Sequence, residues 1–248
     1  GGWGTGAAPG EPMAWGMAEP WAVEGGGVAF PFQGEALGRR VKPLADSVGG
    51  KMVLPCDVED VASVDGVFAE IKKQWGTMDF LVHAIGFSDK NELKGRYVDT
   101  TRANSRRSME ISCFSFTDIA RRAAPLMKNG GSMITLTYAG SMRVMPSYNV
   151  MGVAKAALEM SVKYLAFDLG PKNIRVNAIS AGPINTLAAR GITGFQDMLK
   201  AVREKAPLRR NTEPEEVGDS ALFLASPLRR GITGEILYVD NGYNILAF

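Results

Sequence analysis

Residues 132–155 read SMITLTYAGSMRVMPSYNVMGVAK and join a strand-like run to a helix-like pattern. The run at 132–137 is rich in apolar residues, which is typical of a strand buried on both faces of a sheet. The helical pattern begins at Tyr148 and ends at residue 169, where a Gly-Pro pair follows. Lys155 follows Tyr148 by seven residues, almost two helical turns, so both side chains are expected on one helix face.

Short apolar runs alternate with longer helical patterns along the rest of the chain. The runs typical of buried strands lie at 28–30, 52–54, 79–84, 132–137, 174–179 and 235–239. The helical patterns lie at 61–75, 105–127, 148–169 and 212–225. A capping box from Thr212 to Glu215 is expected to open the last of them. The alternation predicts an α/β fold with a doubly wound, parallel seven-stranded sheet and helices on both faces, in one domain over 1–248.

Composition and charge exclude several classes of protein. Lys and Arg total 28 against 26 Asp and Glu, a net charge of +2, so no basic tail for nucleic acid is indicated. No apolar run is long enough to span a bilayer and no signal peptide is visible, so a cytoplasmic protein is expected. Cys56 and Cys113 lie far apart, without the spacing of metal ligands, and both are expected to be buried free thiols.

The first 32 residues differ from the rest of the chain. Residues 1–5, where a central first strand is expected, read GGWGT, and glycine weakens a strand. Pro20 falls within the expected first helix, and Pro31 lies at the end of the second strand. Residues 5–10, TGAAPG, form a candidate glycine-rich turn whose backbone N–H groups would meet a phosphate group. We therefore expect an atypical segment over 1–32.

Residues 146–157, PSYNVMGVAKAA, closely resemble the active-site helix of the bacterial enoyl-acyl-carrier-protein reductases, a divergent branch of the short-chain dehydrogenase/reductase family. Most members of the larger family have tyrosine four residues before the lysine, where this chain has Met151. The branch has it seven residues before, as Tyr148 is here. Four further stretches resemble the branch: VHAIGF at 82–87, LTYAG at 136–140, NAISAGPINTLA at 177–188, and the closing strand and turn at 234–243.

The resemblance implies a Rossmann-type reductase that acts in fatty-acid elongation. Such an enzyme would reduce the carbon–carbon double bond of trans-2-enoyl thioesters on acyl carrier protein by hydride transfer from NADH, with NADPH the less expected cofactor. The resemblance also implies a cytoplasmic homotetramer, without nucleic-acid or membrane partners. Residues 186–206 would form a lid over the substrate.

The resemblance further implies roles for individual residues. Tyr148 would hydrogen-bond the thioester carbonyl, Lys155 would hold the nicotinamide ribose, and Tyr138 would line the acyl pocket as a second active-site tyrosine. Ser88 would contact the substrate together with the two tyrosines. The residues implied to bind the cofactor are Gly6, Met13, Gln33, Asp57, Val58, Ile85, Gly86, Lys155, Ile184, Thr186, Leu187 and Ala188. Pro12 stands where the family usually has a serine, so no role passes to it.

The chemistry of these residues agrees with such roles and also leaves alternatives. A lysine ammonium near a phenol is expected to lower the pKa of that phenol, and a phenol near a carbonyl oxygen stabilises an enolate. Gln33 is alternatively an exposed loop residue, and Asp57 is alternatively a helix cap. His83, the only histidine, is expected to be a packed or hydrogen-bonded structural residue.

Two other functions stand as hypotheses beside the enoyl reductase. One is a carbonyl (3-oxoacyl) reductase of the wider family, which Met151 disfavours because it takes the usual position of the tyrosine. The other is a non-catalytic scaffold with impaired cofactor binding, which the atypical residues 1–32 motivate. That second hypothesis would leave the catalytic residues idle, so we rank it last.

Overall fold

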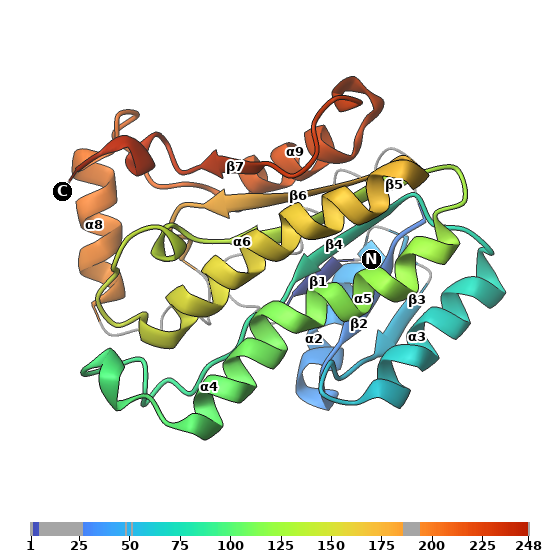
Figure 1. Cartoon of the computed structure of the whole chain (residues 1–248), viewed down its shortest axis with the longest axis horizontal. Coiled ribbons are helices and arrows are strands. Elements are labelled where there is room, and N and C mark those ends of the chain that lie inside the picture. The colour runs from blue at the N-terminus through green and yellow to red at the C-terminus, as the bar shows by residue number, and fades with distance from the viewer. Residues whose placement is uncertain (1, 5–26, 48, 51, 186–193, 248) are drawn as a thin grey trace.

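The computed structural model describes residues 2–4, 27–47, 49–50, 52–185 and 194–247, in which strands and helices alternate (Figure 1). The strands are β1 (Gly2–Gly4), β2 (Ala29–Phe32), β3 (Met52–Pro55), β4 (Phe80–Ala84), β5 (Gly131–Thr137), β6 (Ile174–Ala181) and β7 (Ile236–Val239). The longer helices are α2 (Glu35–Ser47), α3 (Val61–Gln74), α4 (Arg102–Met109), α5 (Ser115–Ala123), α6 (Asn149–Leu169), α8 (Phe195–Lys205) and α9 (Pro214–Ala225). Within these segments, no helix combines the length and apolar character needed to cross a membrane.

The strands form parallel ladders, which confirms the predicted α/β class. Hydrogen bonds join β1-β4-β5-β6-β7 in one sheet and β2-β3 in another, and every pair is parallel. The expected single seven-stranded sheet is not found among the described residues, although β1 also lies beside β2. Pro31 in β2 has no N–H to donate and β1 has three residues, so little ladder can form between them.

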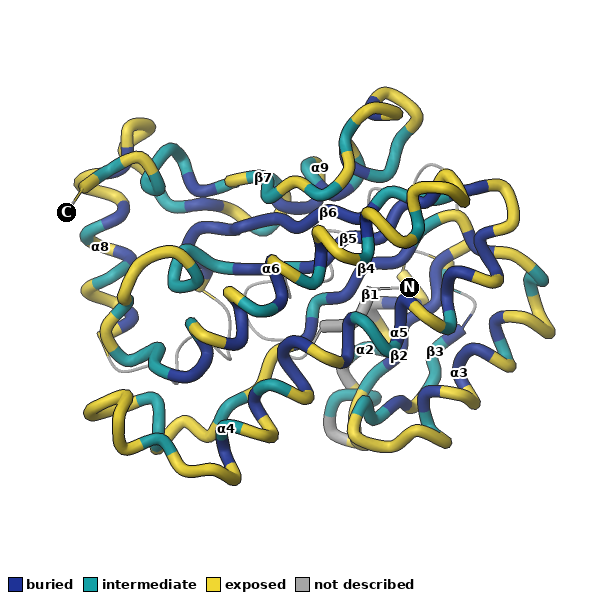
Figure 2. The backbone as a smooth tube through the Cα atoms, in the orientation of Figure 1, coloured by how far each residue is buried: buried dark blue, intermediate teal, exposed yellow. Residues whose placement is uncertain are grey.

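Helices cover both faces of the sheet, as predicted. On one face α3, α5 and α6 pack around Leu81 and Met133, and on the other face α9 packs around Val82 and Ile134. Consecutive strand residues point to opposite faces, so the continuous apolar runs of β4 and β5 supply both layers. The central strands are therefore buried, while the outer sides of the helices are exposed (Figure 2).

The helix predicted over 105–127 begins earlier, at Arg102, and is interrupted. A π-helix over Glu110–Phe114 joins α4 to α5. The hydroxyl of Ser115 donates to the carbonyl oxygen of Ile111 at 2.6 Å, and such side-chain bonds compete with the regular helical ladder. Short π-helical insertions occur frequently at functional sites, so this π-helix is a candidate part of one.

Two helix starts differ from the predicted ones. Tyr148 was expected inside α6 but occupies its N-cap position, between Ser147 with φ of 60° and Asn149 with φ of 37°. Left-handed backbone is costly for residues other than glycine, and it is found most often at functional sites. The capping box of α9 is formed by Glu213 and Glu216, one residue later than expected.

The buried polar residues of the core include His83. Its Nδ1 lies 2.8 Å from Thr135 Oγ1 and its Nε2 lies 2.8 Å from Ser115 Oγ. Burial lowers the pKa of His83 to about 3, so the ring stays neutral, and the predicted structural role is confirmed. Cys56 and Cys113 are buried free thiols, also as predicted.

Leu224 of α9 is 1% exposed, whereas Leu228, just beyond that helix, is 85% exposed. We expect Leu224→Ala to lower the free energy of unfolding by about 2–5 kcal/mol, because it leaves a cavity between α9 and the sheet. Leu228→Ala is the matched control and should change that free energy by less than about 0.5 kcal/mol. Urea unfolding followed by circular dichroism measures both, and equal losses would contradict the placement of α9.

Candidate active site

The end of β5 and the start of α6 bring three predicted catalytic residues together. Tyr138 follows β5 directly, Tyr148 caps α6, and Lys155 lies within α6. The rings of Tyr138 and Tyr148 meet edge to face, with 5.1 Å between centroids and 69° between planes. The Tyr138 hydroxyl also donates to the sulfur of Met198 in α8 at 3.1 Å. The site is therefore assembled at the carboxyl end of the central strands, with α8 against one tyrosine.

The position of the Tyr148 ring depends on two glycines. A Cβ added at Gly140 would lie 2.5 Å from Tyr148 Cδ1 and 2.8 Å from its Cε1. A Cβ added at Gly152 would lie 2.7 Å from the carbonyl oxygen of Gly140. These distances leave no room for a side chain, so both glycines allow α6 to pack closely against the turn that follows β5.

Lys155 is a buried lysine held by the main chain of β5. It is 7% exposed, and its Nζ donates to the carbonyl oxygen of Leu136 at 2.8 Å. Burial lowers the pKa of Lys155 to about 8, while Cys113 and Glu159 act in the opposite direction. The ammonium also faces the segment after β4, because a Cβ built at Gly86 would lie 3.8 Å from Nζ.

The two tyrosines differ from expectation in their acidity. Burial raises the pKa of Tyr148, and Tyr138 and Glu159 raise it further, whereas Lys155 was expected to lower it. The reason is that the Lys155 ammonium is bonded to the oxygen of Leu136 while the phenol is desolvated. Burial also raises the pKa of Tyr138 to about 12. Both phenols are thus protonated at neutral pH and can donate a hydrogen bond.

Glu159 is a buried carboxylate that the sequence reasoning missed. It is 8% exposed, and its Oε1 accepts a hydrogen bond from Thr137 Oγ1 at 2.6 Å. Thr137 is the last residue of β5, so this bond fixes the strand end that carries Tyr138. Glu159 follows Lys155 by one helical turn, and that spacing on a buried helix face was the signal that could have found it.

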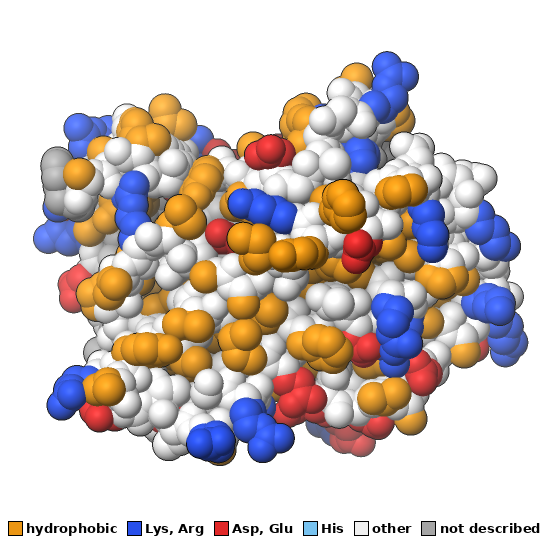
Figure 3. Space-filling model, viewed as in Figure 1, with side chains coloured by type: hydrophobic (Ala, Val, Ile, Leu, Met, Phe, Trp, Pro, Cys, Tyr) orange, Lys and Arg blue, Asp and Glu red, His pale blue; other side chains and the backbone are white. Residues whose placement is uncertain are grey.

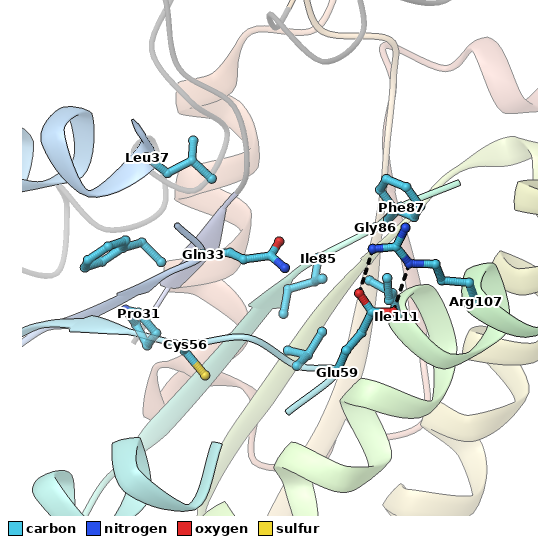
Figure 4. Close-up of a pocket in the computed structure, with 12 residues that line it drawn as sticks. Pro31, Gln33, Leu37, Cys56, Glu59, Ile85, Gly86, Phe87, Arg107 and Ile111 are labelled. Carbon is cyan, nitrogen blue, oxygen red and sulfur yellow. Dashed lines mark hydrogen bonds and ion pairs between the residues drawn. The ribbon is translucent and has the colours of Figure 1, made fainter. Parts of the chain in front are cut away.

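A cavity of about 280 Å³ opens where β2, β3 and β4 end (Figure 4). Four of the predicted cofactor residues, Gln33, Val58, Ile85 and Gly86, line it. The complete lining is Pro31, Phe32, Gln33, Leu37, Cys56, Val58, Glu59, Ile85, Gly86, Phe87, Arg107 and Ile111. Ligands of open parallel sheets bind outside the carboxyl ends of the strands, and a largely apolar slot with few polar groups fits an adenosine. The residues present therefore fit a dinucleotide.

Two other predicted residues have partners within the protein. Asp57 is not in the cavity lining, and its Oδ1 accepts from the Glu59 N–H at 3.0 Å. The cap of α3 is Asp60 rather than Asp57. The Ser88 hydroxyl donates to Asn104 Oδ1 at 3.3 Å, so it is engaged by α4. The contact of Ser88 with the substrate stays a prediction.

Of the remaining predicted cofactor residues, the structure describes only Ile184. Ile184 is 6% exposed, and its side chain packs in the core with Ile179 and Val217, which leaves its main chain for any ligand. The others lie outside the described residues: Gly6, Met13, Thr186, Leu187 and Ala188.

The fold and site define a reductase of the Rossmann type, with a dinucleotide cavity beside a buried lysine and paired phenols. The chain matches the family model described as Enoyl-(Acyl carrier protein) reductase over residues 6–244. It is 64% identical to enoyl-[acyl-carrier-protein] reductase [NADH] 2 of Rhizobium meliloti over 242 residues. These aligned residues make up 98% of this chain and 90% of that protein. The chain belongs to the enoyl-acyl-carrier-protein reductase family, as its motifs predicted.

Solved structures of relatives share the whole fold. The enoyl-(acyl-carrier-protein) reductase of Anaplasma phagocytophilum in complex with NAD has a TM-score of 0.92 and 55% identity, over 95% of this chain and 90% of that one. The Bacillus cereus enoyl-acyl carrier protein reductase with NADP⁺ and indole naphthyridinone has a TM-score of 0.95 and 48% identity, over 99% and 96% of the two chains. Both likenesses support the Rossmann-type architecture.

If Lys155 contacts the cofactor, as its motif predicts, its pKa of about 8 sets how cofactor binding depends on pH. Above that pH the ammonium loses a proton and donates fewer hydrogen bonds, so the affinity for NADH should fall. Glu159→Gln removes a charge that raises the Lys155 pKa, so the fall should move to lower pH. Asp168→Asn removes an exposed carboxylate of the same helix that is not among the groups shifting the Lys155 pKa, and it should leave the midpoint in place. Fluorescence titrations with NADH measure the profiles, and identical profiles for wild type and E159Q would contradict this account.

Proposed function

We propose that this chain reduces the carbon–carbon double bond of trans-2-enoyl-acyl-carrier-protein thioesters with NADH, in fatty-acid elongation. The observation that carries the proposal is the edge-to-face pair of Tyr138 and Tyr148 next to buried Lys155. The cavity at the ends of β2, β3 and β4 supplies a place for the adenosine half of the cofactor. Family membership and the NADH named for the Rhizobium relative support the same reaction.

The residues of the site have distinct tasks in this reaction. NADH supplies the hydride that adds to the β-carbon of the enoyl thioester. The electrons of the double bond move to the thioester oxygen and give an enolate, and a proton from solvent then adds to the α-carbon. Tyr148 donates a hydrogen bond to that oxygen, because its raised pKa keeps the phenol protonated. Tyr138 packs on Tyr148 and lines the acyl side, and the main chain of Ser88 contacts the thioester.

The cofactor is held along the carboxyl end of the sheet. Gln33, Val58, Ile85 and Gly86 contact its adenosine half, since all four line the cavity. Lys155 binds the nicotinamide ribose, and the closeness of its Nζ to Gly86 supports this role. Further contacts are proposed, on family likeness, for Gly6, Met13, Asp57, Ile184, Thr186, Leu187 and Ala188.

A single domain over 1–248 surrounds this site. We infer that β2 and β3 extend the five-stranded sheet beside β1 into one seven-stranded sheet, as the contact between β1 and β2 supports. We propose a substrate lid over residues 186–206, of which 186–193 lie outside the described residues, and the bond from Tyr138 to Met198 supports that role for α8. A cytoplasmic location agrees with the two free, buried thiols.

The partners are an acyl carrier protein and further copies of this chain. On α8, three exposed cations, Lys200, Arg203 and Lys205, outnumber two exposed anions, Asp197 and Glu204, and this small positive excess suits an acidic carrier. Apolar side chains gather over α6 (Figure 3). Val153, Met160, Tyr164 and Phe167 of α6 are 45%, 51%, 69% and 82% exposed, and Phe114 nearby is 57% exposed. An apolar stripe of this kind marks a protein interface, which supports a homotetramer.

The assay that tests the reaction follows NADH absorbance at 340 nm with a crotonyl thioester as substrate. Wild-type protein should consume NADH, and Tyr148→Phe should lower kcat by about 100-fold, because one hydrogen bond to the enolate oxygen is lost. Lys155→Met should mainly raise KM for NADH. Tyr97→Phe, at a tyrosine that is 53% exposed, is the control. Folded wild type that ignores the enoyl thioester, or reduces a 3-oxoacyl thioester instead, would refute the proposal.

Light scattering after size exclusion tests the interface. The wild type should have a mass near four times 26.6 kDa. Phe167→Glu should lower that mass, because a carboxylate on the apolar stripe of α6 is costly to bury. Val144→Glu, at a residue that is 97% exposed outside the stripe, should leave the mass unchanged. A wild-type monomer, or a variant F167E of unchanged mass, would count against this interface.

A further inference from the structure

Glu59 and Arg107 form a two-point ion pair at the adenosine cavity. Arg107 Nε donates to Glu59 Oε1 at 2.9 Å, and Nη2 donates to Oε2 at 2.8 Å. The planar fork of a guanidinium matches a carboxylate in this arrangement, which fixes direction as well as distance. The Arg107 side chain is 50% exposed and that of Glu59 is 28% exposed, so the pair lies at the cavity mouth.

The pair connects walls of the cavity that are distant in sequence. Glu59 lies in the loop after β3, next to Val58, whereas Arg107 belongs to α4. The guanidinium carbon of Arg107 also lies 4.4 Å from the centroid of the Phe87 ring, in the segment after β4. Glu59, Phe87 and Arg107 all line the cavity, and Figure 4 shows the guanidinium between the other two. One side chain of α4 therefore ties together the segments that follow β3 and β4.

Hydrogen bonds with a residue of the π-helix hold Phe87 in place. The Phe87 N–H donates to Ser112 Oγ at 2.9 Å, and Ser112 Oγ donates to the Phe87 carbonyl oxygen at 3.0 Å. Ser112 lies in the π-helix and is buried. One hydroxyl thus bonds both the N–H and the carbonyl oxygen of Phe87, and the Phe87 ring offers a defined surface for the guanidinium.

We propose that Glu59, Arg107 and Phe87 form a clasp that sets the width of the cavity and so positions the adenine half of the cofactor. The proposal rests on the proposed function, which takes the cavity as the dinucleotide site. Both members of the ion pair lie on the lining of the adenosine cavity, apart from the tyrosine pair where reduction takes place. They are positioning residues.

A clasp of this kind holds the walls of the cavity in their binding positions before the ligand binds. A planar purine needs two walls at a fixed spacing, and ordering mobile walls on binding costs affinity. Among the described residues, this pair supplies the side-chain hydrogen bonds between α4 and the loop after β3, and without it the two would be joined through packing alone. Loss of the pair should therefore weaken every ligand that carries adenine and spare ligands that lack it. Salt should reduce the effect, because the pair is partly exposed.

The test compares three ligands by fluorescence or calorimetric titration: NADH, 5′-AMP, and reduced nicotinamide mononucleotide, which has no adenine. Glu59→Gln and Arg107→Ala should each raise Kd for NADH and 5′-AMP by about threefold to tenfold. The double variant should have a Kd no higher than that of the single variant with the higher Kd, because both single variants and the double variant lose the same interaction. Kd for the mononucleotide, and kcat at saturating NADH, should stay at wild-type values.

Asp65→Asn provides a matched control. Asp65 pairs with Arg122 between α3 and α5, but neither residue lines the cavity, so all three affinities should be unchanged. Arg107→Lys should recover part of the affinity, since lysine keeps the charge but lacks the fork. If the wild type binds NADH and the variants bind NADH and 5′-AMP as tightly as the wild type does, the clasp is overturned and the proposed function is not. If the wild type binds neither NADH nor 5′-AMP, both the clasp and the proposed function are overturned. If the variants lose as much affinity for the mononucleotide as for NADH, the clasp is overturned.

Discussion

The burial of the Lys155 ammonium between α6 and β5 is the constraint on which the site depends. A buried cation must be hydrogen-bonded, and the carbonyl oxygen of Leu136 accepts one of its bonds at 2.8 Å. That contact requires α6 to lie close to the end of β5, and Gly140 and Gly152 provide the necessary space. The carboxylate of Glu159 offsets part of the charge from the next turn of the helix.

The same close packing determines the chemistry of the tyrosines. Because α6 begins directly beside the end of β5, the Tyr148 ring is desolvated against Tyr138 and its pKa rises. A protonated phenol donates a hydrogen bond to a developing enolate without itself carrying charge. The Lys155 ammonium holds the strand end through Leu136, and the role proposed for it is to bind the cofactor rather than to ionise the tyrosine. The phenol donors are thus held in place before any substrate binds.

Local patterns predicted those parts of the structure that depend on local spacing. The apolar strands, the helix after Tyr148 and the family motif were all visible as runs or fixed intervals, and the structure confirms the parallel α/β fold. The clasp was not visible, because Glu59 and Arg107 are 48 residues apart and meet only in the folded chain. The raised pKa of Tyr148 was missed for a related reason, since desolvation depends on every element that covers the ring. Among the predicted cofactor residues, the side chain of Ile184 packs in the core, which spacing along the chain cannot show.

The fate of the transferred hydrogen tests the central claim most directly. Crotonyl thioester is reduced with NADH that carries deuterium at the transferred C4 position, and the product is examined by mass spectrometry and NMR. If Tyr148 and Lys155 direct an enoyl reduction, the saturated acyl product carries the deuterium on its β-carbon, and in deuterated water a second deuterium enters the α-carbon. A product without deuterium on the β-carbon would contradict the account. So would deuterium found only on the hydroxyl-bearing carbon of the 3-hydroxyacyl thioester formed from a 3-oxoacyl thioester offered in parallel.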